Sequence, residues 1–364
     1  MKNTIGNSLT VTLFGESHGK AIGAVIDGIS SGIKVDEDYI ANMLSRRRPK
    51  DALSTPRQER DEFSILSGVF EGYTTGTPIC ISIPNADTHS SDYGQMQYKM
   101  RPSHADYTAN CRYNGFQDYR GGGHFSGRIT AALVAAGAIV LPALNKKGIY
   151  IGTHIKSIAG INDIDFTNNK EIIDISKKDF PVLDETAKDK MQQKILEAKS
   201  QGDSVGGVLE TAIIGLPAGV GEPWFDTVEG MLSHAIFSVP AVKGIEFGLG
   251  FDFADKCGSQ ANDQMYVDGD SVKCYTNNNG GVIGGITNGM PIVFRAVIKP
   301  TPTISKEQKT VDINTMSDTT LEARGRHDPC IAHRAAVVVE SVAALVIADM
   351  LTTKFGTAWL AKFE

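Results

Sequence analysis

The alternation of apolar and polar residues predicts strands in the first quarter of the chain. Residues 9–14 mix threonine and valine with larger apolar residues, and residues 20–29 combine β-branched residues with two glycines. Glycine and β-branching both disfavour helix, so the second segment is also predicted to be a strand. Residues 63–69 and 77–84 alternate in the same way on either side of a turn-rich segment, which predicts a second pair of strands.

Five segments have the composition or periodicity of helices. Residues 39–44 predict a short helix that Pro49 ends. Residues 126–145 are rich in Ala, Val and Leu and predict a buried helix, for which Ser126 is a candidate N-cap. The other three helical segments lie at residues 184–199, 221–237 and 331–350.

Further strands alternate with these helices in the second half of the chain. Three segments have the character of strands, at residues 205–215, 244–250 and 291–299. Residues 85–123, in contrast, show little regular pattern, and an irregular segment of that length in a compact protein usually serves function. No clear linker divides the chain, so we expect residues 1–364 to form a single interleaved domain.

Composition narrows the classes of function. Of the 364 residues, 41% are hydrophobic, which is enough for a sizeable core, and the formal net charge of −6 argues against a general nucleic-acid binder. The five cysteines are scattered and odd in number, so neither a disulfide framework nor a metal site is predicted. No signal peptide is recognisable, and the apolar run at 131–144 is short for a membrane span. We therefore expect a soluble cytoplasmic protein with no nucleic-acid or membrane partner.

The arginines are unevenly distributed. Nine of the 13 lie between residues 46 and 128 and four between residues 295 and 334, whereas residues 129–294 contain none. The guanidinium group matches two oxygens of a phosphate or carboxylate at once, which suits it to anion binding. Either this segregation is chance, or the two arginine-bearing segments meet around a polyanionic ligand, which is the interpretation we favour.

Residues 15–19, Gly-Glu-Ser-His-Gly, match the G-x-S-x-G pattern of a hydrolase nucleophile elbow. An elbow requires a helix after its serine, whereas residues 20–29 have the character of a strand. The motif also precedes the several strands that a hydrolase sheet needs, so we disfavour Ser17 as a nucleophile. Two alternatives stay open, namely a hairpin turn without chemistry and a turn that presents His18 as a proton donor.

A second histidine lies in a proline-stiffened loop at residues 100–108. Here His104 is flanked by Arg101 and Asp106, an arrangement that suits a general acid. The alternative is a loop histidine that only bonds to backbone.

Three consecutive glycines precede the helix that starts near Ser126, between Arg120 and Arg128. Free backbone N–H groups at a helix start attract anions, so this segment predicts an anion or cofactor site. The alternative is a tightly packed turn.

The last third of the chain holds a strand end and a helix start with similar features. The strand at residues 291–299 ends at Lys299, and a rigid Pro-Thr-Pro segment follows. This arrangement suits a planar or anionic group, or else it closes an edge strand. Asp328 follows Arg326 and His327 and is either a helix N-cap or a carboxylate base.

Taken in order, these motifs resemble those of the chorismate synthase family. The resemblance extends from about Thr4 to Ala348 and is carried by residues 15–19, 27–28, 46–49, 66–72, 101–107, 120–128 and 326–330. It implies an α+β fold in which antiparallel β-sheets are sandwiched with helices, and a homotetramer. It implies a lyase of the shikimate pathway that eliminates phosphate from 5-enolpyruvylshikimate 3-phosphate in an anti-1,4 sense to give chorismate. Reduced FMN is the implied cofactor, with no net redox change.

The resemblance also implies roles for individual residues. His18 would protonate the reduced flavin, His104 would protonate the departing phosphate, and Asp328 would act with flavin N5 in removing the C6 proton. Arg47 would belong to the arginines that bind the phosphate-bearing ligands. The implied FMN pocket comprises His124, Phe125, Ser126, Pro240, Ala241, Gly284, Lys299, Pro300, Thr301, Pro302, Thr303 and Arg326.

Several positions depart from the family's pattern. Ser103 stands where many members have glycine, Pro240 replaces a common Asn, and residues 124–125 replace a frequent Arg-Ser. An arginine that is common shortly after the triple arginine is missing at residues 51–53. No flavin-reductase extension is recognisable, so we expect the reduced flavin to come from an external source and not from intrinsic reduction with NADPH.

Overall fold

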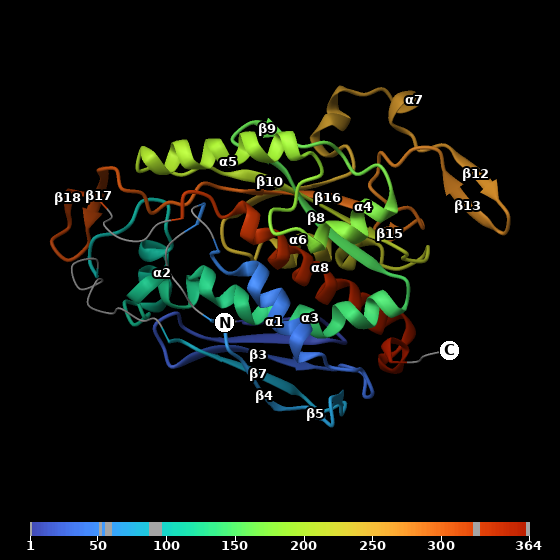
Figure 1. Cartoon of the computed structure of the whole chain (residues 1–364), viewed down its shortest axis with the longest axis horizontal. Helices are drawn as coiled ribbons and strands as arrows, with labels where there is room; N and C mark the ends of the chain where they lie inside the picture. Colours follow the sequence, from blue (N-terminus) through green and yellow to red (C-terminus); the bar gives the residue numbers. More distant parts are fainter. Residues whose placement is uncertain (1, 51–52, 55–59, 87–96, 323–327, 362–364) are drawn as a thin grey trace.

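Two five-stranded antiparallel sheets enclose a layer of helices in the computed structural model (Figure 1). The structure describes residues 2–50, 53–54, 60–86, 97–322 and 328–361. The lower sheet in Figure 1 has the strand order β1-β2-β3-β7-β4, and the upper sheet has the order β11-β16-β10-β8-β9. The predicted α+β sandwich of antiparallel sheets and helices is confirmed.

The lower sheet consists of the four strands predicted near the N-terminus and one short strand before them. In its last strand the isoleucines at positions 79, 81 and 83 are fully buried while the residues between them are half-buried, as a sheet covered on one face requires. The turn-rich segment forms a small separate hairpin. The bounds are β1 (Thr4–Ile5), β2 (Thr10–Gly15), β3 (Ala21–Asp27), β4 (Ser64–Ser67) and β7 (Ile79–Pro84), with β5 (Val69–Phe70) and β6 (Tyr73–Thr74) in the hairpin.

The upper sheet is formed by the second half of the chain. Its central strand pairs on one side with the strand after the buried helix and on the other with the strand that ends near Lys299. The predicted strands at 205–215, 244–250 and 291–299 are all present, with their ends within three residues of the predicted ones. The bounds are β8 (Tyr150–Ile158), β9 (Ile161–Asn162), β10 (Gly207–Ile214), β11 (Val242–Phe247) and β16 (Ile292–Ile298).

The helices between the sheets form the centre of the core. The two longest are buried nearly all round and pack so closely that a Cβ added at Gly137 would lie 2.5 Å from the Cβ of Ser341. One of them contacts the lower sheet and the other the upper sheet, which joins both sheets to one hydrophobic cluster. The helices are α1 (Glu37–Arg47), α3 (Thr130–Lys146), α6 (Val228–Ile236) and α8 (Ala332–Phe355).

Two of these core helices are long and apolar enough to cross a membrane. The first, residues 127–146, includes the apolar run that was expected to be too short for a span. The helix is longer than that run and is long enough to span a membrane, so the expectation about length is wrong. In both, the apolar window lies inside the protein, with 89% of it buried in residues 127–146 and 100% in α8. The core of a folded protein accounts for the hydropathy of both helices.

Smaller elements surround this core. The predicted charged helix is present as α5 (Glu185–Ser200), with Asp184 as its N-cap. The segment expected to be irregular contains a helix, α2 (Asp106–Tyr113), so that expectation is wrong there. Four hairpin strands and two short helices were also not predicted, namely β12 (Met265–Asp268), β13 (Ser271–Cys274), β17 (Gln308–Asp312), β18 (Ser317–Leu321), α4 (Asn169–Asp174) and α7 (Gly258–Ala261).

Candidate active site

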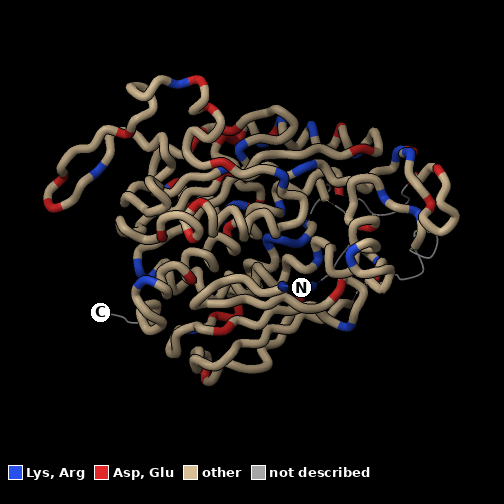
Figure 2. The backbone as a smooth tube through the Cα atoms, turned by 180° about the vertical axis from the view of Figure 1, so that it is seen from behind, with Lys and Arg blue, Asp and Glu red and all other residues tan. Residues whose placement is uncertain are grey.

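A cavity of about 1190 Å³ lies where segments far apart in the sequence meet. A site for one small ligand typically has roughly 300–1,000 Å³, so this cavity has room for two. Its wall is formed by β1, the end of α1, the loop at 103–105, the segment 121–130, the ends of β11 and β16, and the start of α8. Figure 2 shows lysine and arginine positions gathered beside the N-terminus, between the two sheets.

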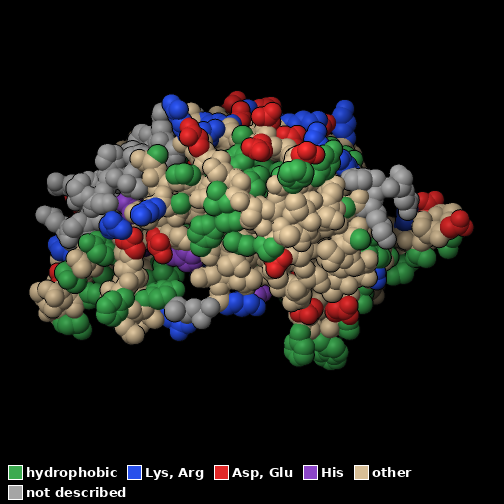
Figure 3. Space-filling view, turned by 90° about the horizontal axis from the view of Figure 1, so that it is seen from below, with side chains coloured by type: hydrophobic (Ala, Val, Ile, Leu, Met, Phe, Trp, Pro, Cys, Tyr) green, Lys and Arg blue, Asp and Glu red, His purple; other side chains and the backbone are tan. Residues whose placement is uncertain are grey.

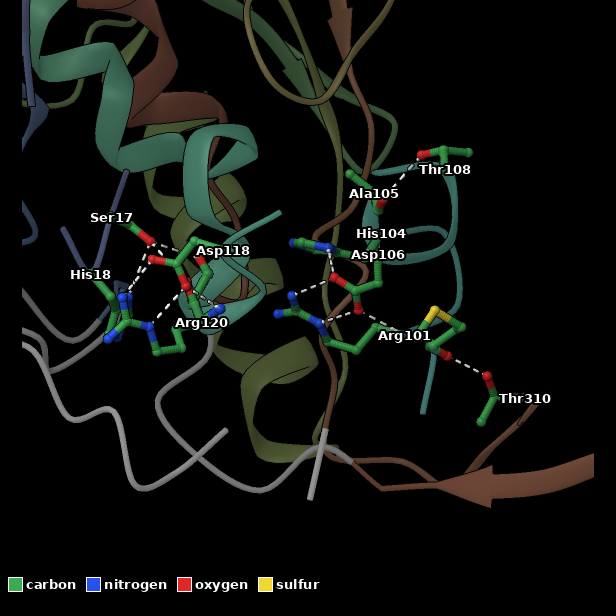
Figure 4. Close-up of polar contacts among 12 residues, drawn as sticks. Ser17, His18, Arg101, His104, Ala105, Asp106, Thr108, Asp118, Arg120 and Thr310 are labelled. Atoms are coloured by element: carbon green, nitrogen blue, oxygen red, sulfur yellow. Dashed lines mark hydrogen bonds and ion pairs between the residues drawn. The ribbon is translucent and has the colours of Figure 1, made fainter. Parts of the chain in front are cut away.

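His104 lines this cavity and is held by an acidic partner. Its Nδ1 lies 2.7 Å from Oδ1 of Asp106, and Arg101 donates two hydrogen bonds of 2.7 Å to the same carboxylate (Figure 4). Burial opposes ionisation of Asp106, but the hydrogen bonds from His104 and Arg101 outweigh it and hold the pKa of Asp106 well below its usual range. The alternative of a histidine bonded only to backbone is therefore wrong.

The loop before His104 has an unusual backbone conformation. Ser103 has a φ of +59°, a region that suits glycine, and it is the position where many members of the resembled family have glycine. The Lys299 ammonium donates to the Ser103 carbonyl at 2.6 Å. The end of β16 therefore fixes the loop that carries His104.

His18 lies in the turn between β2 and β3, not in an elbow. Its side chain is buried, and its Nδ1 is 3.1 Å from the Ser17 hydroxyl. Ser17 is fully buried, and a strand follows the turn, so the disfavoured nucleophile interpretation is not supported. His18 is not among the residues that line the cavity. It packs directly behind Gly121, and Gly121 does line the cavity.

The three glycines before Ser126 all have positive φ and all pack tightly. A Cβ on Gly121 would lie 2.2 Å from Cε1 of His18, and one on Gly122 would lie 3.1 Å from Cε1 of His104. The third, Gly123, approaches the carbonyl of Asp118. This segment therefore forms the tightly packed turn. The ring of His18 lies against Gly121, and the ring of His104 lies against the next residue, Gly122. Whether it also binds an anion stays a prediction.

Asp328 lines the same cavity as His104. Its Oδ2 accepts a hydrogen bond of 2.6 Å from Arg334, which also lines the cavity. The N-cap of α8 is Ile331, so the alternative of Asp328 as N-cap is wrong. Its neighbours Arg326 and His327 lie outside the described residues.

Only some of the arginines reach the cavity. Among the described residues its lining includes Arg47, Arg48, Arg128 and Arg334. Three others are used in ion pairs elsewhere, Arg46 with Glu340, Arg101 with Asp106 and Arg120 with Asp118. The two arginine-bearing segments do meet, as expected, but Arg120 does not bracket the cavity with Arg128.

Most residues of the expected FMN pocket share this cavity. Its lining includes His124, Phe125, Ser126, Pro240, Ala241, Lys299, Thr301, Pro302 and Thr303. Pro300 is not among the lining residues, and Arg326 lies outside the described part of the chain. Gly284 sits in the turn between β14 (Val282–Ile283) and β15 (Ile286–Thr287), before β16 begins. Gly284 is not among the residues that line the cavity.

Sequence reasoning missed three residues that shape the site. Arg334 lies in an apolar helix pattern, and its only signal was its membership of the second arginine-bearing segment. Lys243 lines the cavity from β11 and gave no signal. Asp61 lies behind the cavity with a φ of +53° and bonds to both Arg47 and Arg128, and its only signal was the arginine-rich context.

Comparison with known proteins identifies relatives along the whole chain. The family model described as "Chorismate synthase" matches residues 9–352. The chorismate synthase of Pyrococcus abyssi is 48% identical over 346 residues, which cover 95% of this chain and 96% of that protein. That of Dehalococcoides mccartyi is 45% identical over 352 residues, 96% of each chain. A solved structure titled "Crystal Structure of Chorismate Synthase" superposes with a TM-score of 0.77 at 31% identity and covers 98% of this chain and 95% of that one.

Proposed function

The chain belongs to the chorismate synthase family, and from this premise we propose that the cavity beside α8 carries out the family's reaction with His104, Asp328 and His18 as its proton-carrying groups. The reaction eliminates phosphate to form chorismate, as a lyase of aromatic amino acid biosynthesis, and requires reduced FMN. The observation that carries the proposal is that His104 and Asp328, 224 positions apart in the sequence, line one arginine-rich cavity.

The residues of the cavity fit a flavin phosphate and a phosphorylated substrate. Cationic side chains lie beside an apolar wall that includes Ile5, Leu13 and Val338. The buried Thr301 hydroxyl lines the cavity and has no hydrogen-bond partner among the residues that the structure describes, which leaves it for a ligand. When bound, reduced FMN lends electron density transiently to the substrate. Lys299, Thr301 and the segment 124–126 would hold it.

His104 acts in this proposal as the general acid. Its Nδ1 is committed to Asp106, so the proton available to a ligand is the one on Nε2 of the imidazolium. The carboxylate of Asp106 fixes the ring and balances the imidazolium charge. Protonation makes phosphate a better leaving group, and the electron pair of the broken C3–O bond leaves with it.

Asp328 acts as the base. Arg334 donates a hydrogen bond of 2.6 Å to one of its oxygens, which fixes the orientation of the carboxylate. The proton at C6 of the substrate passes to the carboxylate of Asp328, and the electron pair of that C–H bond forms a double bond between C6 and C1. The π pair between C1 and C2 moves to C2–C3 as the C3–O pair leaves with phosphate.

His18 holds the third proton. It is buried behind Gly121, so its contact with a ligand depends on the absence of a side chain there. A proton on His18 would balance the negative charge of the bound cofactor.

The test is an anaerobic assay with 5-enolpyruvylshikimate 3-phosphate and reduced FMN. We expect phosphate and chorismate to appear in equal amounts, and only with reduced FMN. Absence of phosphate release from folded protein would refute the proposal, as would release that does not depend on FMN.

We also propose a homotetramer of single-domain chains in the cytoplasm, with flavin reduced externally. The face of the lower sheet supports assembly, because its middle carries mainly hydrophobic and uncharged side chains, with charges gathered toward the edges (Figure 3). Leu66, Phe70 and Tyr73 in or beside β4 to β6 are at least half exposed, and exposed apolar surface of this kind marks interfaces. Sedimentation of the purified protein tests the stoichiometry, and a monomer would refute it.

A further inference from the structure

Asp61 is a buried carboxylate outside the cavity that contacts two of the arginines in its wall. Its side chain is 0% exposed, and it accepts a hydrogen bond of 2.8 Å from Nη2 of Arg47. Its other oxygen accepts a hydrogen bond from Nη1 of Arg128. Burial opposes ionisation of Asp61, but the two guanidinium groups outweigh it and lower the pKa of Asp61.

The two arginines differ in how much of their donor capacity is already used. Besides Asp61, Arg128 donates to Asn85 Oδ1 at 3.1 Å and to the Pro84 carbonyl at 3.2 Å. It is thus anchored to the end of β7. The Nε of Arg47, in contrast, is buried and has no hydrogen-bond partner within the described part of the chain, although Arg47 lines the cavity and its side chain is only 10% exposed.

A chain of contacts therefore ends at Arg47. Asn85 donates to the carbonyls of Glu16 and Gly19 in the turn that carries His18, and its amide oxygen accepts from Arg128. Arg128 fixes Asp61, and Asp61 fixes Arg47. A guanidinium pre-oriented in this way binds a phosphate with less loss of side-chain entropy than a freely rotating one.

Asp61 faces both guanidinium groups, and the buried Nε of Arg47 has no hydrogen-bond partner among the described residues. A buried donor without an acceptor is costly, and a phosphate oxygen supplies the missing acceptor. We propose that Asp61 is a positioning residue that holds Arg47 in the orientation that binds the phosphate of the substrate. This inference rests on the proposed function.

The test compares binding of 5-enolpyruvylshikimate 3-phosphate with binding of its dephosphorylated counterpart, using protein saturated with oxidised FMN so that no turnover occurs. Asp61→Asn should weaken binding of the phosphorylated compound by about 10- to 100-fold and leave binding of the dephosphorylated one unchanged. A structural role alone would weaken both equally. The matched control is Asp174→Asn. Asp174 is the last residue of α4, and its exposed carboxylate pairs with Lys177.

Three outcomes decide the proposal. Equal affinity of the Asp61→Asn variant and the wild type for the phosphorylated compound would overturn it, as would an equal loss for both compounds. If Asp61→Asn does not fold, Asp61→Glu is used, because it keeps the charge but displaces the carboxylate by one methylene; unchanged phosphate selectivity in that variant would also overturn the proposal. If the wild type itself binds neither compound, the proposed function fails instead.

Discussion

His104 and Asp106 lie 2.7 Å apart, Nδ1 to Oδ1, although they belong to different local structures, a strained loop and the first turn of α2. The helix brings the carboxylate back under the imidazole, and Arg101 closes the contact from the other side. The ring of His104 is therefore fixed before any substrate binds.

The first prediction concerns this pair. Asp106→Asn keeps the size of the side chain but removes the charge that balances an imidazolium, so we expect turnover to fall by roughly 10- to 100-fold, less than the 10²- to 10⁴-fold that a general acid itself supplies. The alkaline limb of the pH–rate profile, on which a general acid loses its proton, should move to lower pH in the folded variant. An unchanged profile in the folded variant would show that Asp106 does not act through His104.

The second prediction concerns Gly121. Alanine there would place its Cβ 2.2 Å from the ring of His18, so the ring must move, and a displacement of about 1 Å in an active site can cost roughly 10²-fold in rate. Gly72→Ala is the control, because Gly72 also has a positive φ but has no atom within 4 Å of the added Cβ. Both variants should lose stability because of the positive φ, and Gly121→Ala should lose more because of the contact with His18, as measured by denaturant unfolding; only Gly121→Ala should lose turnover. Equal turnover in the two variants would remove His18 from the mechanism.

The third prediction concerns stability against pH. His154 is fully buried between Asp163, at 2.9 Å, and Glu210, at 3.1 Å. Burial alone would lower the pKa of His154, but the hydrogen bonds to both carboxylates outweigh it and raise the pKa above its usual value of 6.5. The stabilisation is therefore fully present below pH 6.5 and is lost as the pH rises through the folded-state value.

Denaturant unfolding at several pH values measures this effect. The wild type should lose free energy of unfolding as the pH rises above 6.5, and His154→Gln should lack that loss. At pH 6 the variant should be less stable by about 3 kcal/mol or more, because it leaves two buried carboxylates without their cation. Parallel pH curves for the two proteins would contradict the assignment.

Patterning predicted most of the fold because burial imposes it locally. In β7 every second residue is an isoleucine that faces the core, and α3 and α8 are so apolar that only a buried position suits them. The small hairpins β12–β13 and β17–β18 were missed because they are largely exposed and carry no such signal. The helix α2 was missed because its few buried residues give no period.

The site was predictable by residue type but not by geometry. The histidines and Asp328 stood out because ionisable groups beside glycine or proline are uncommon outside function. Nothing in the sequence pattern could show that Asp61 holds Arg47, since that contact depends on how α1 packs beside the segment before β4. The contact of Arg334 with Asp328 depends on how the chain enters α8. That Gly284 lies in the β14–β15 turn and does not line the cavity likewise follows only from the folded structure.

The most direct test of the account is anaerobic phosphate release with reduced FMN by His104→Ala and Asp328→Asn, compared with Asp174→Asn. The account predicts that the first two lose roughly 10²-fold or more in turnover, still bind the substrate and still fold, whereas the control keeps the wild-type rate. Wild-type turnover in either of the first two variants would contradict the claim that one cavity brings this acid and this base to the same substrate.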